Sequence, residues 1–355
     1  MKKRLLFLLF LFCLFFGFFS KPLAQEETLM EGEIIEILVE EDHLEQIYQQ
    51  VLVLVKTGRF VNQKVTVETG FYDPLSGQRF KTGDKIILAL SSDMEGNNVF
   101  YIADYVRRPS LLLLAAIFVL LVLFIGRTRG FFSLIGLVLS FVVIMFLVLP
   151  LINQGGNPVL ISVLASVLMV PLLFYSAHGF NRKTTVAAAS TIIALTLTGV
   201  LARTFVVWAN ISGLSSEEMG FLQISHQGLI NPQGLVLAGI IIGALGVLDD
   251  VTISQSAVVE KLKKVNPKIN PKRLFKESLS VGQDHIASMV NTLVLVYAGA
   301  SLPLLLLFIN STQKISLVVN YEIVAEELIR ILVGSIGLIA AVPITTFLAV
   351  VFVRK

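Results

Sequence analysis

Apolar and polar stretches alternate along this chain, and the pattern divides it into three parts. The first part has a basic start over residues 1–4, an apolar run over residues 5–19 and a small residue, Ala24, at a cleavage point. This pattern predicts a secretory signal peptide over residues 1–24. Pro22 fits the cleavage pattern poorly, so an uncleaved anchor is the alternative. In both cases we expect the next segment to lie outside the cytoplasm.

The second part, residues 25–108, is polar and rich in β-branched and aromatic residues between turn signals. Such alternation predicts five short strands, over residues 33–39, 47–56, 60–68, 85–90 and 99–106. Five strands in so short a stretch favour a small extracytoplasmic all-β domain, an OB-like barrel. The acidic residues Glu40, Glu41 and Asp42 beside His43 offer ligands for a cation, but we interpret them as a solvated loop.

The third part, residues 109–355, contains apolar runs long enough to cross a bilayer. They predict a polytopic α-helical membrane domain of about seven spans, at residues 111–126, 131–152, 159–177, 184–208, 234–255, 286–309 and 328–353. Residues 211–233 mix apolar and polar positions and predict a short amphipathic segment on the outer membrane surface. His226 in that segment is interpreted as a hydrogen-bonded loop histidine.

The charges between the predicted spans give an orientation. Lysines and arginines cluster in alternate loops and at the C-terminus, whereas the other loops contain only Lys314. The positive-inside rule places the basic loops and the C-terminus in the cytoplasm. The β domain is then outside, in agreement with the signal segment. We therefore predict a multi-pass protein of the cytoplasmic membrane.

Composition supports a membrane protein and excludes several other classes. Hydrophobic residues make up 55% of the chain, and its mean hydropathy is +0.81. Residues 25–108 hold 15 acidic and 8 basic residues. The basic residues of the third part lie beside the spans without interleaved aromatics, so no nucleic-acid partner is expected. Cys13 is the single cysteine, which excludes a disulfide and a cysteine metal site.

Two adjacent carboxylates, Asp249 and Asp250, fall inside the fifth predicted span. Asp249 lies about 23 Å along a helix counted from residue 234, within a hydrocarbon core about 30 Å thick. Charges at that depth are costly and indicate a functional site. A stripe of small residues on the same helix ends at Asp250; it comprises Gly239, Gly243 and Gly246. Because small residues at this spacing admit a second helix, we expect Asp250 to face protein. The alternative is that the pair is purely structural.

A second polar group opens the sixth predicted span. Asp284 and His285 lie at its cytoplasmic end, and Ser288 and Asn291 follow further in. The two helices flank one loop and are expected to be neighbours. A single inward-facing pocket is therefore predicted, formed by Asp249, Asp250, Thr252, Ser254, Gln255, Asp284, His285, Ser288 and Asn291. Its oxygen ligands suit a cation or a proton relay. The alternative is that Asp284 caps the helix and His285 lies among the headgroups.

Two further positions are interpreted structurally. Thr184 or Thr185 is expected to cap the fourth span. Arg203, near the outer end of that span, is expected to extend toward the surface or to pair with a carboxylate. Hydrolase, nucleotide-binding and zinc-protease signatures are missing, so we predict no enzymatic activity and no cofactor beyond a bound cation of unknown identity. Aspartyl proteolysis stays a minor alternative, requiring Asp284 as a second aspartate.

The motifs around these residues resemble a known family. The sequences LGVLDDVTISQ at 245–255, GFNRKT at 179–184 and GQDHIA at 282–287 are similar to the YibE/F-like family of bacterial multispan membrane proteins. The resemblance covers roughly residues 110–353, with the Asp-Asp-Val-Thr motif as its specific part. It implies a membrane protein with an N-terminal extracytoplasmic segment, described at most as a permease, and it supplies no substrate.

Two functions follow as hypotheses. The first is a permease that moves a small ion or solute, with Asp249 and Asp250 binding the coupling cation or proton. The second is a membrane scaffold or sensor that transports nothing and whose β domain binds a protein partner. A homo-oligomer is compatible with both, and the lipid bilayer is a partner in each.

Overall fold

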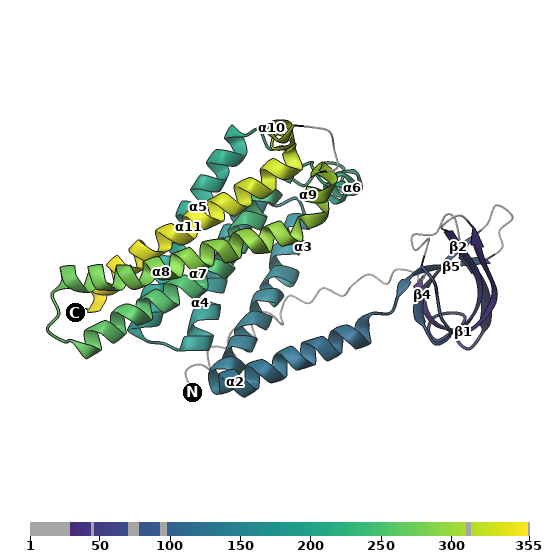
Figure 1. Ribbon diagram of the computed structural model, residues 1–355, viewed down its shortest axis with the longest axis horizontal. Helices are drawn as coiled ribbons and strands as arrows, with labels where there is room; N and C mark the ends of the chain where they lie inside the picture. Colours follow the sequence, from purple (N-terminus) through teal and green to yellow (C-terminus); the bar gives the residue numbers. More distant parts are fainter. Residues whose placement is uncertain (1–28, 44–45, 70–77, 93–97, 310–313, 354–355) are drawn as a thin grey trace. The chain divides into compact units, whose positions relative to one another are not determined.

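Two compact units make up the described protein. The computed structural model describes residues 29–43, 46–69, 78–92, 98–309 and 314–353. One unit extends to Leu121 and contains the strands, whereas the described part of the other begins at Val122 and is helical (Figure 1). The predicted signal segment, including Cys13, lies outside the described residues.

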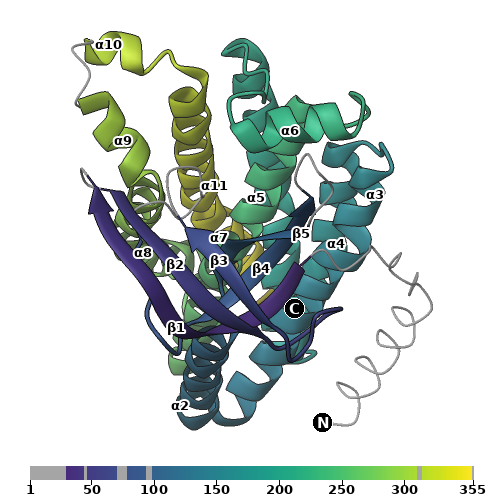
Figure 2. The ribbon, with the colours of Figure 1, turned by 90° about the vertical axis from the view of Figure 1, so that its right-hand side faces the viewer.

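The β unit is a single antiparallel sheet that curls into a half-barrel (Figure 2). Its strands are β1 (Leu29–His43), β2 (Gln46–Val55), β3 (Lys64–Thr69), β4 (Lys85–Ser92) and β5 (Asn98–Tyr105). They lie in the order β3-β2-β1-β4-β5, and β3 also contacts β5. Alternate residues such as Ile34, Val53 and Leu88 fill its core, as the period of a half-buried strand requires. The predicted all-β domain is confirmed as an antiparallel sheet, whereas its OB type stays a prediction.

Two details of the β unit differ from expectation. The third strand begins at Lys64 rather than at residue 60, because the chain turns through Gly58 and Asn62, both with positive φ. The acidic residues expected in a solvated loop belong instead to β1, which continues to His43. The carboxylate of Glu40 accepts a hydrogen bond from Gln49 Nε2 at 2.9 Å and forms an ion pair with Arg79 at 3.1 Å.

The remaining described residues are helical. Their elements are α2 (Arg108–Val143), the π-helical turn η1 (Ile144–Val148), α3 (Leu149–Asn153), α4 (Pro158–His178), α5 (Arg182–Trp208), α6 (Glu217–Ser225), α7 (Pro232–Val265), α8 (Pro271–Ala300), α9 (Leu302–Ile309), α10 (Ile315–Val318) and α11 (Glu322–Val353). Five helical segments in the described chain are long and apolar enough to cross a membrane. The pair α8–α9, bent by 69°, would make a sixth.

The predicted count of seven spans depends on how residues 108–153 cross the membrane. They form one helical segment of 46 residues, about 69 Å at 1.5 Å per residue and more than twice the hydrocarbon thickness. The helical dihedrals are broken at Arg127, with φ 49° and ψ −133°. A Cβ added to Gly130 would lie 2.2 Å from the Val122 carbonyl oxygen, so only glycine fits beside this break. The first two predicted spans lie on either side of it, and the number of spans stays a prediction.

In the helical unit, α7 is the central helix and packs against α4, α5, α8 and α11 (Figure 1). Its buried side chains, including Ile241, Leu245 and Leu248, form the core with α4, α5 and α11. The short helix α6 lies within the segment predicted to be amphipathic, and Phe221 and Ile224 on it are exposed. Whether that segment lies on a membrane surface stays a prediction.

Asparagine side chains begin four of these helices, and this corrects two predicted caps. Asn181 Oδ1 accepts the backbone N–H of Thr184 at 2.9 Å, so α5 starts at Arg182 and neither Thr184 nor Thr185 is its cap. Asn270 caps α8, which places Asp284 in the helix interior rather than at its start. The residues between the fifth and sixth predicted spans, 256–285, are mostly helical, because α7 continues to Val265 and α8 begins at Pro271.

Candidate functional site

Asp249 and Asp250 lie well inside α7, and the structure reverses their expected roles. Asp249 is half-buried, and its Oδ1 is enclosed without a hydrogen-bond partner among the described residues. Asp250 is exposed on the surface of the helical unit. The prediction that Asp250 faces protein is therefore wrong for the single chain. Successive helical residues point about 100° apart, and Asp249 is on the side of α7 that faces the core.

The glycine stripe explains this reversal. A Cβ added to Gly239 or Gly246 would meet no atom within 4 Å, and one added to Gly243 would meet only the Tyr297 hydroxyl, at 3.4 Å. A second helix was expected to pack closely on the stripe. Within the described chain, none does so at Gly239 or Gly246. The close helix contacts are at other glycines. A Cβ at Gly337 would lie 2.1 Å from Thr198 Oγ1, and one at Gly282 would lie 2.5 Å from Val342.

The polar residues of α8 are placed beside the aspartates without enclosing them. His285 and Asp250 lie within electrostatic range of each other, as do Asp249 and Asp250. Asp284, His285, Ser288 and Asn291 are all exposed. The side chains of Asp284 and Asn291 form no hydrogen bond within the described chain. The structure thus supports a neighbouring α7–α8 pair without a closed pocket between the two helices.

Thr252, Ser254 and Gln255 of the predicted pocket make structural hydrogen bonds. Thr252 Oγ1 lies 2.7 Å from Thr191 Oγ1 of α5. Gln255 Nε2 donates to the Ser278 carbonyl oxygen at 2.9 Å and to Thr346 Oγ1 at 2.7 Å, joining α7 to α8 and α11. Ser254 Oγ donates to the Val251 carbonyl oxygen of its own helix. These contacts satisfy buried polar groups, as packing requires. The candidate site therefore comprises only Asp249, Asp250 and His285.

An unpartnered buried carboxylate oxygen is the chemically unusual feature of this site. Buried polar atoms are normally hydrogen-bonded, and a buried charge needs a compensating partner. The buried hydroxyls of Ser162 and Ser166 on α4 also lack partners among the described residues. Across the part of the chain that is described, no three His, Cys, Asp or Glu side chains are grouped as metal ligands. Asp249 can therefore accept a proton, or contribute one oxygen to a cation held mainly by other oxygen donors.

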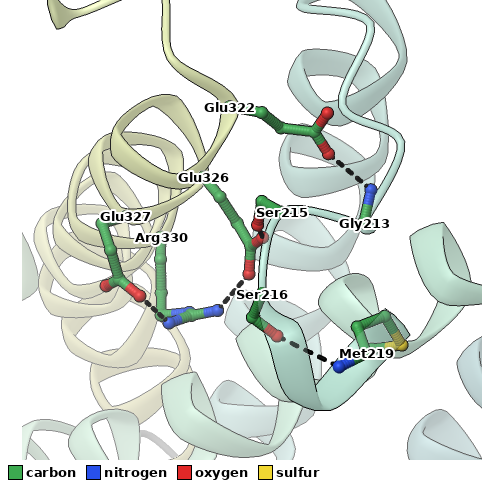
Figure 3. A network of polar contacts seen from close by, with 8 residues as sticks. All are labelled: Gly213, Ser215, Ser216, Met219, Glu322, Glu326, Glu327 and Arg330. Carbon is green, nitrogen blue, oxygen red and sulfur yellow. Dashed lines mark hydrogen bonds and ion pairs between the residues drawn. The ribbon is translucent and has the colours of Figure 1, made fainter. Parts of the chain in front are cut away.

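Sequence reasoning missed a second polar cluster where α11 begins (Figure 3). Glu322 accepts hydrogen bonds from the backbone N–H groups of Ser212 and Gly213, at 2.8 and 2.6 Å. Arg330 forms ion pairs with Glu326, at 2.7 Å, and with Glu327. These residues were assigned to a loop and to the edge of a span that was expected to start at residue 328. The i,i+3 and i,i+4 spacing of Glu327 and Glu326 to Arg330 was the signal that a helix had already begun.

Two other residues have clear outcomes. His226 contacts the Leu222 carbonyl oxygen through Nδ1, at 3.1 Å, and Asn153 Oδ1 through Nε2, at 2.6 Å, so its role as a hydrogen-bonded loop histidine is confirmed. Arg203 is exposed at an apolar groove of about 230 Å³ between α4, α5 and α7, with no carboxylate partner in the described chain. Arg203 was expected either to extend toward the surface or to pair with a carboxylate. The second expectation is not met among the described residues.

The fold and the site together define a class of protein. Long apolar helices packed around a central helix with two acidic residues characterise a polytopic membrane protein. Residues 114–355, more than half of the chain, match the model of the YibE/F-like protein family. The chain therefore belongs to the YibE/F-like family, as its motifs indicated. Among curated proteins and solved structures, none matches it.

Proposed function

We propose that this protein is a permease that moves a small cation or a proton across the cytoplasmic membrane. In this proposal Asp249 is the binding group, and Asp250 with His285 forms the adjoining polar entry. The β unit lies outside and the C-terminus in the cytoplasm, as the loop charges predict. The protein catalyses no reaction and needs no cofactor other than the ion it moves.

The observation that carries the proposal is the carboxylate of Asp249. Its Oδ1 is shielded from solvent and has no hydrogen-bond partner among the described residues. Such an atom is costly unless a proton or cation neutralises it. A purely structural carboxylate would be expected to accept hydrogen bonds from backbone N–H groups, as Glu322 does, or to form an ion pair, as Glu326 does. The location of Asp249 therefore favours reversible binding.

A small cavity beside Arg330 lies along α7 from the aspartates. Gly243, seven residues before Asp250 and thus about 10 Å along α7, lies 3.4 Å, measured from its ideal Cβ, from the Tyr297 hydroxyl. Gly243, Tyr297 and Arg330 line a small cavity of about 10 Å³ between α7, α8 and α11. That volume is close to what one water occupies. The other lining residues, such as Ile240, Val247 and Leu293, are apolar, so the cavity provides room for one water beside Arg330.

Flux through reconstituted liposomes tests the proposal. The purified protein would be assayed for proton movement with a trapped pH-sensitive dye, under a potential set by potassium and valinomycin, and for Na⁺ and K⁺ uptake with radioisotopes. We expect flux above that of empty liposomes for one of these ions, and a loss of at least tenfold in Asp249→Asn. Glu218→Gln, which removes an exposed carboxylate of α6, is the control and should keep the parent rate.

Two results would count against the proposal. A rate in Asp249→Asn equal to that of the parent would remove Asp249 from the transport site. Absence of flux for all three ions would favour the scaffold or sensor alternative. In that alternative the β unit binds a protein partner through exposed apolar side chains such as Leu38 and Val99.

A further inference from the structure

Helix α8 carries an exposed seam of regularly spaced residues. Val281, Asp284, Ser288, Asn291 and Leu295 follow one another at intervals of three and four, and all five are exposed. Val281 is 47% exposed and Leu295 is 70% exposed. This 3-4-3-4 spacing is that of the contact seam between two helices that pack along their length.

The opposite side of α8 already has its partners. Gly282 and Leu293 are buried there, and α8 packs against α7 and α11. At 100° per residue, Gly282 and Asp284 point roughly 160° apart around the helix. The exposed seam therefore faces away from the helical unit, so α7 and α11 cannot cover it.

Lipid is a poor neighbour for this seam. The bent pair α8–α9 is long and apolar enough to be one membrane span, and Asn291 lies inside the predicted apolar run, where an amide facing hydrocarbon is costly. Polar side chains in membrane helices normally hydrogen-bond across to another helix. Residues 111–126, the first predicted span, contain no polar side chain and cannot supply such partners.

We propose that this seam is the contact surface between two copies of the chain. Copies inserted in the same orientation are related by a twofold axis along the membrane normal, so the same seam of each copy meets at the axis. The surface is self-complementary at Asn291, because a carboxamide both donates and accepts hydrogen bonds. The Asn291 side chains would hydrogen-bond across the axis, and Val281 and Leu295 would pack at the two ends. This inference stands independently of the transport proposal.

Disulfide trapping in membranes tests the contact directly. Ser288→Cys would be introduced together with Cys13→Ser, which removes the single native cysteine. Mild oxidation of intact membranes should convert most of the protein to a covalent dimer. Val294→Cys is the matched control, because Val294 is 39% exposed yet points about 100° away from Leu295. Little dimer is expected from it. Equal yields from the two variants, or no dimer from Ser288→Cys, would overturn the proposal.

A second measurement separates a second copy from another partner. Counting of fluorescent subunits by single-molecule photobleaching in liposomes should give two per particle for the parent. Asn291→Leu should weaken self-association about threefold to thirtyfold, the range expected for one interhelical hydrogen bond in a membrane. One subunit per particle for the parent would contradict the proposal, even if the protein transports ions. Two subunits in a protein without flux would uphold the contact and remove only the transport function.

Discussion

At the residue scale, the two adjacent aspartates differ in burial, because only the side of α7 that carries Asp249 packs against other helices. Both lie in the long apolar helix α7, as predicted, whereas their depth in a membrane stays a prediction. The sequence pattern assigned the buried role to Asp250 because the glycines share its face. The core instead uses the large residues Ile241, Leu245 and Leu248. No rule on small residues reveals whether their partner helix belongs to the same chain, so burial could not be predicted from spacing alone.

The first prediction concerns the cost of the uncompensated carboxylate. In cation-free buffer at alkaline pH, Asp249→Asn should raise the free energy of unfolding by about 1–2 kcal/mol, because a neutral amide replaces a buried charge without a partner. Asp250→Asn should change it by less than about 0.5 kcal/mol, since the side chain is exposed. Thermal unfolding of the purified variants measures both. Equal effects of the two substitutions would mean that both carboxylates share one environment.

At the element scale, the sequence located most helices but not their ends. Apolar length predicted the bodies of α4, α5, α7 and α11, because hydrophobic runs report directly on the membrane-spanning part. It stopped α7 at residue 255, whereas α7 continues with charged residues to Val265. Hydropathy carries no information on a helix that extends beyond its apolar part. For the same reason the predicted span starts at residue 328 and leaves Glu322 and Glu326 outside the helix, whereas α11 begins at Glu322.

The second prediction belongs to the element scale and compares two glycines on packed helices. Gly337→Ala should destabilise the protein by about 1–3 kcal/mol, because the added Cβ would lie 2.1 Å from Thr198 Oγ1 and push α11 from α5. Gly246→Ala adds its Cβ to open space and should be neutral, or stabilising by up to about 1 kcal/mol through helix propensity. Melting temperatures of the two variants decide this. The reverse order would show that the α5–α11 contact is looser than the structure indicates.

At the scale of the whole molecule, a β unit and a helical unit were both predictable. Period-two alternation and turn residues gave five strands, all of which are found. The strand order was not predictable, because β1 pairs not only with its neighbour in sequence, β2, but also with β4, which lies more than 40 residues further along the chain. The candidate site was predicted only in part. Asp249, Asp250 and His285 lie near one another, whereas Thr252 and Gln255 belong to hydrogen bonds between helices that single-sequence patterns cannot reveal.

The most direct measurement of the central claim is the ligand dependence of stability. Melting temperatures of the parent and of Asp249→Asn would be recorded from pH 5 to 9, and with added Na⁺, K⁺, Mg²⁺ or Ca²⁺. A ligand that binds only the folded protein raises its melting temperature. The account predicts that the parent responds to pH or to one of these cations and that Asp249→Asn loses this response. An identical response in the two proteins would show that Asp249 binds neither a proton nor a cation, and would contradict the account.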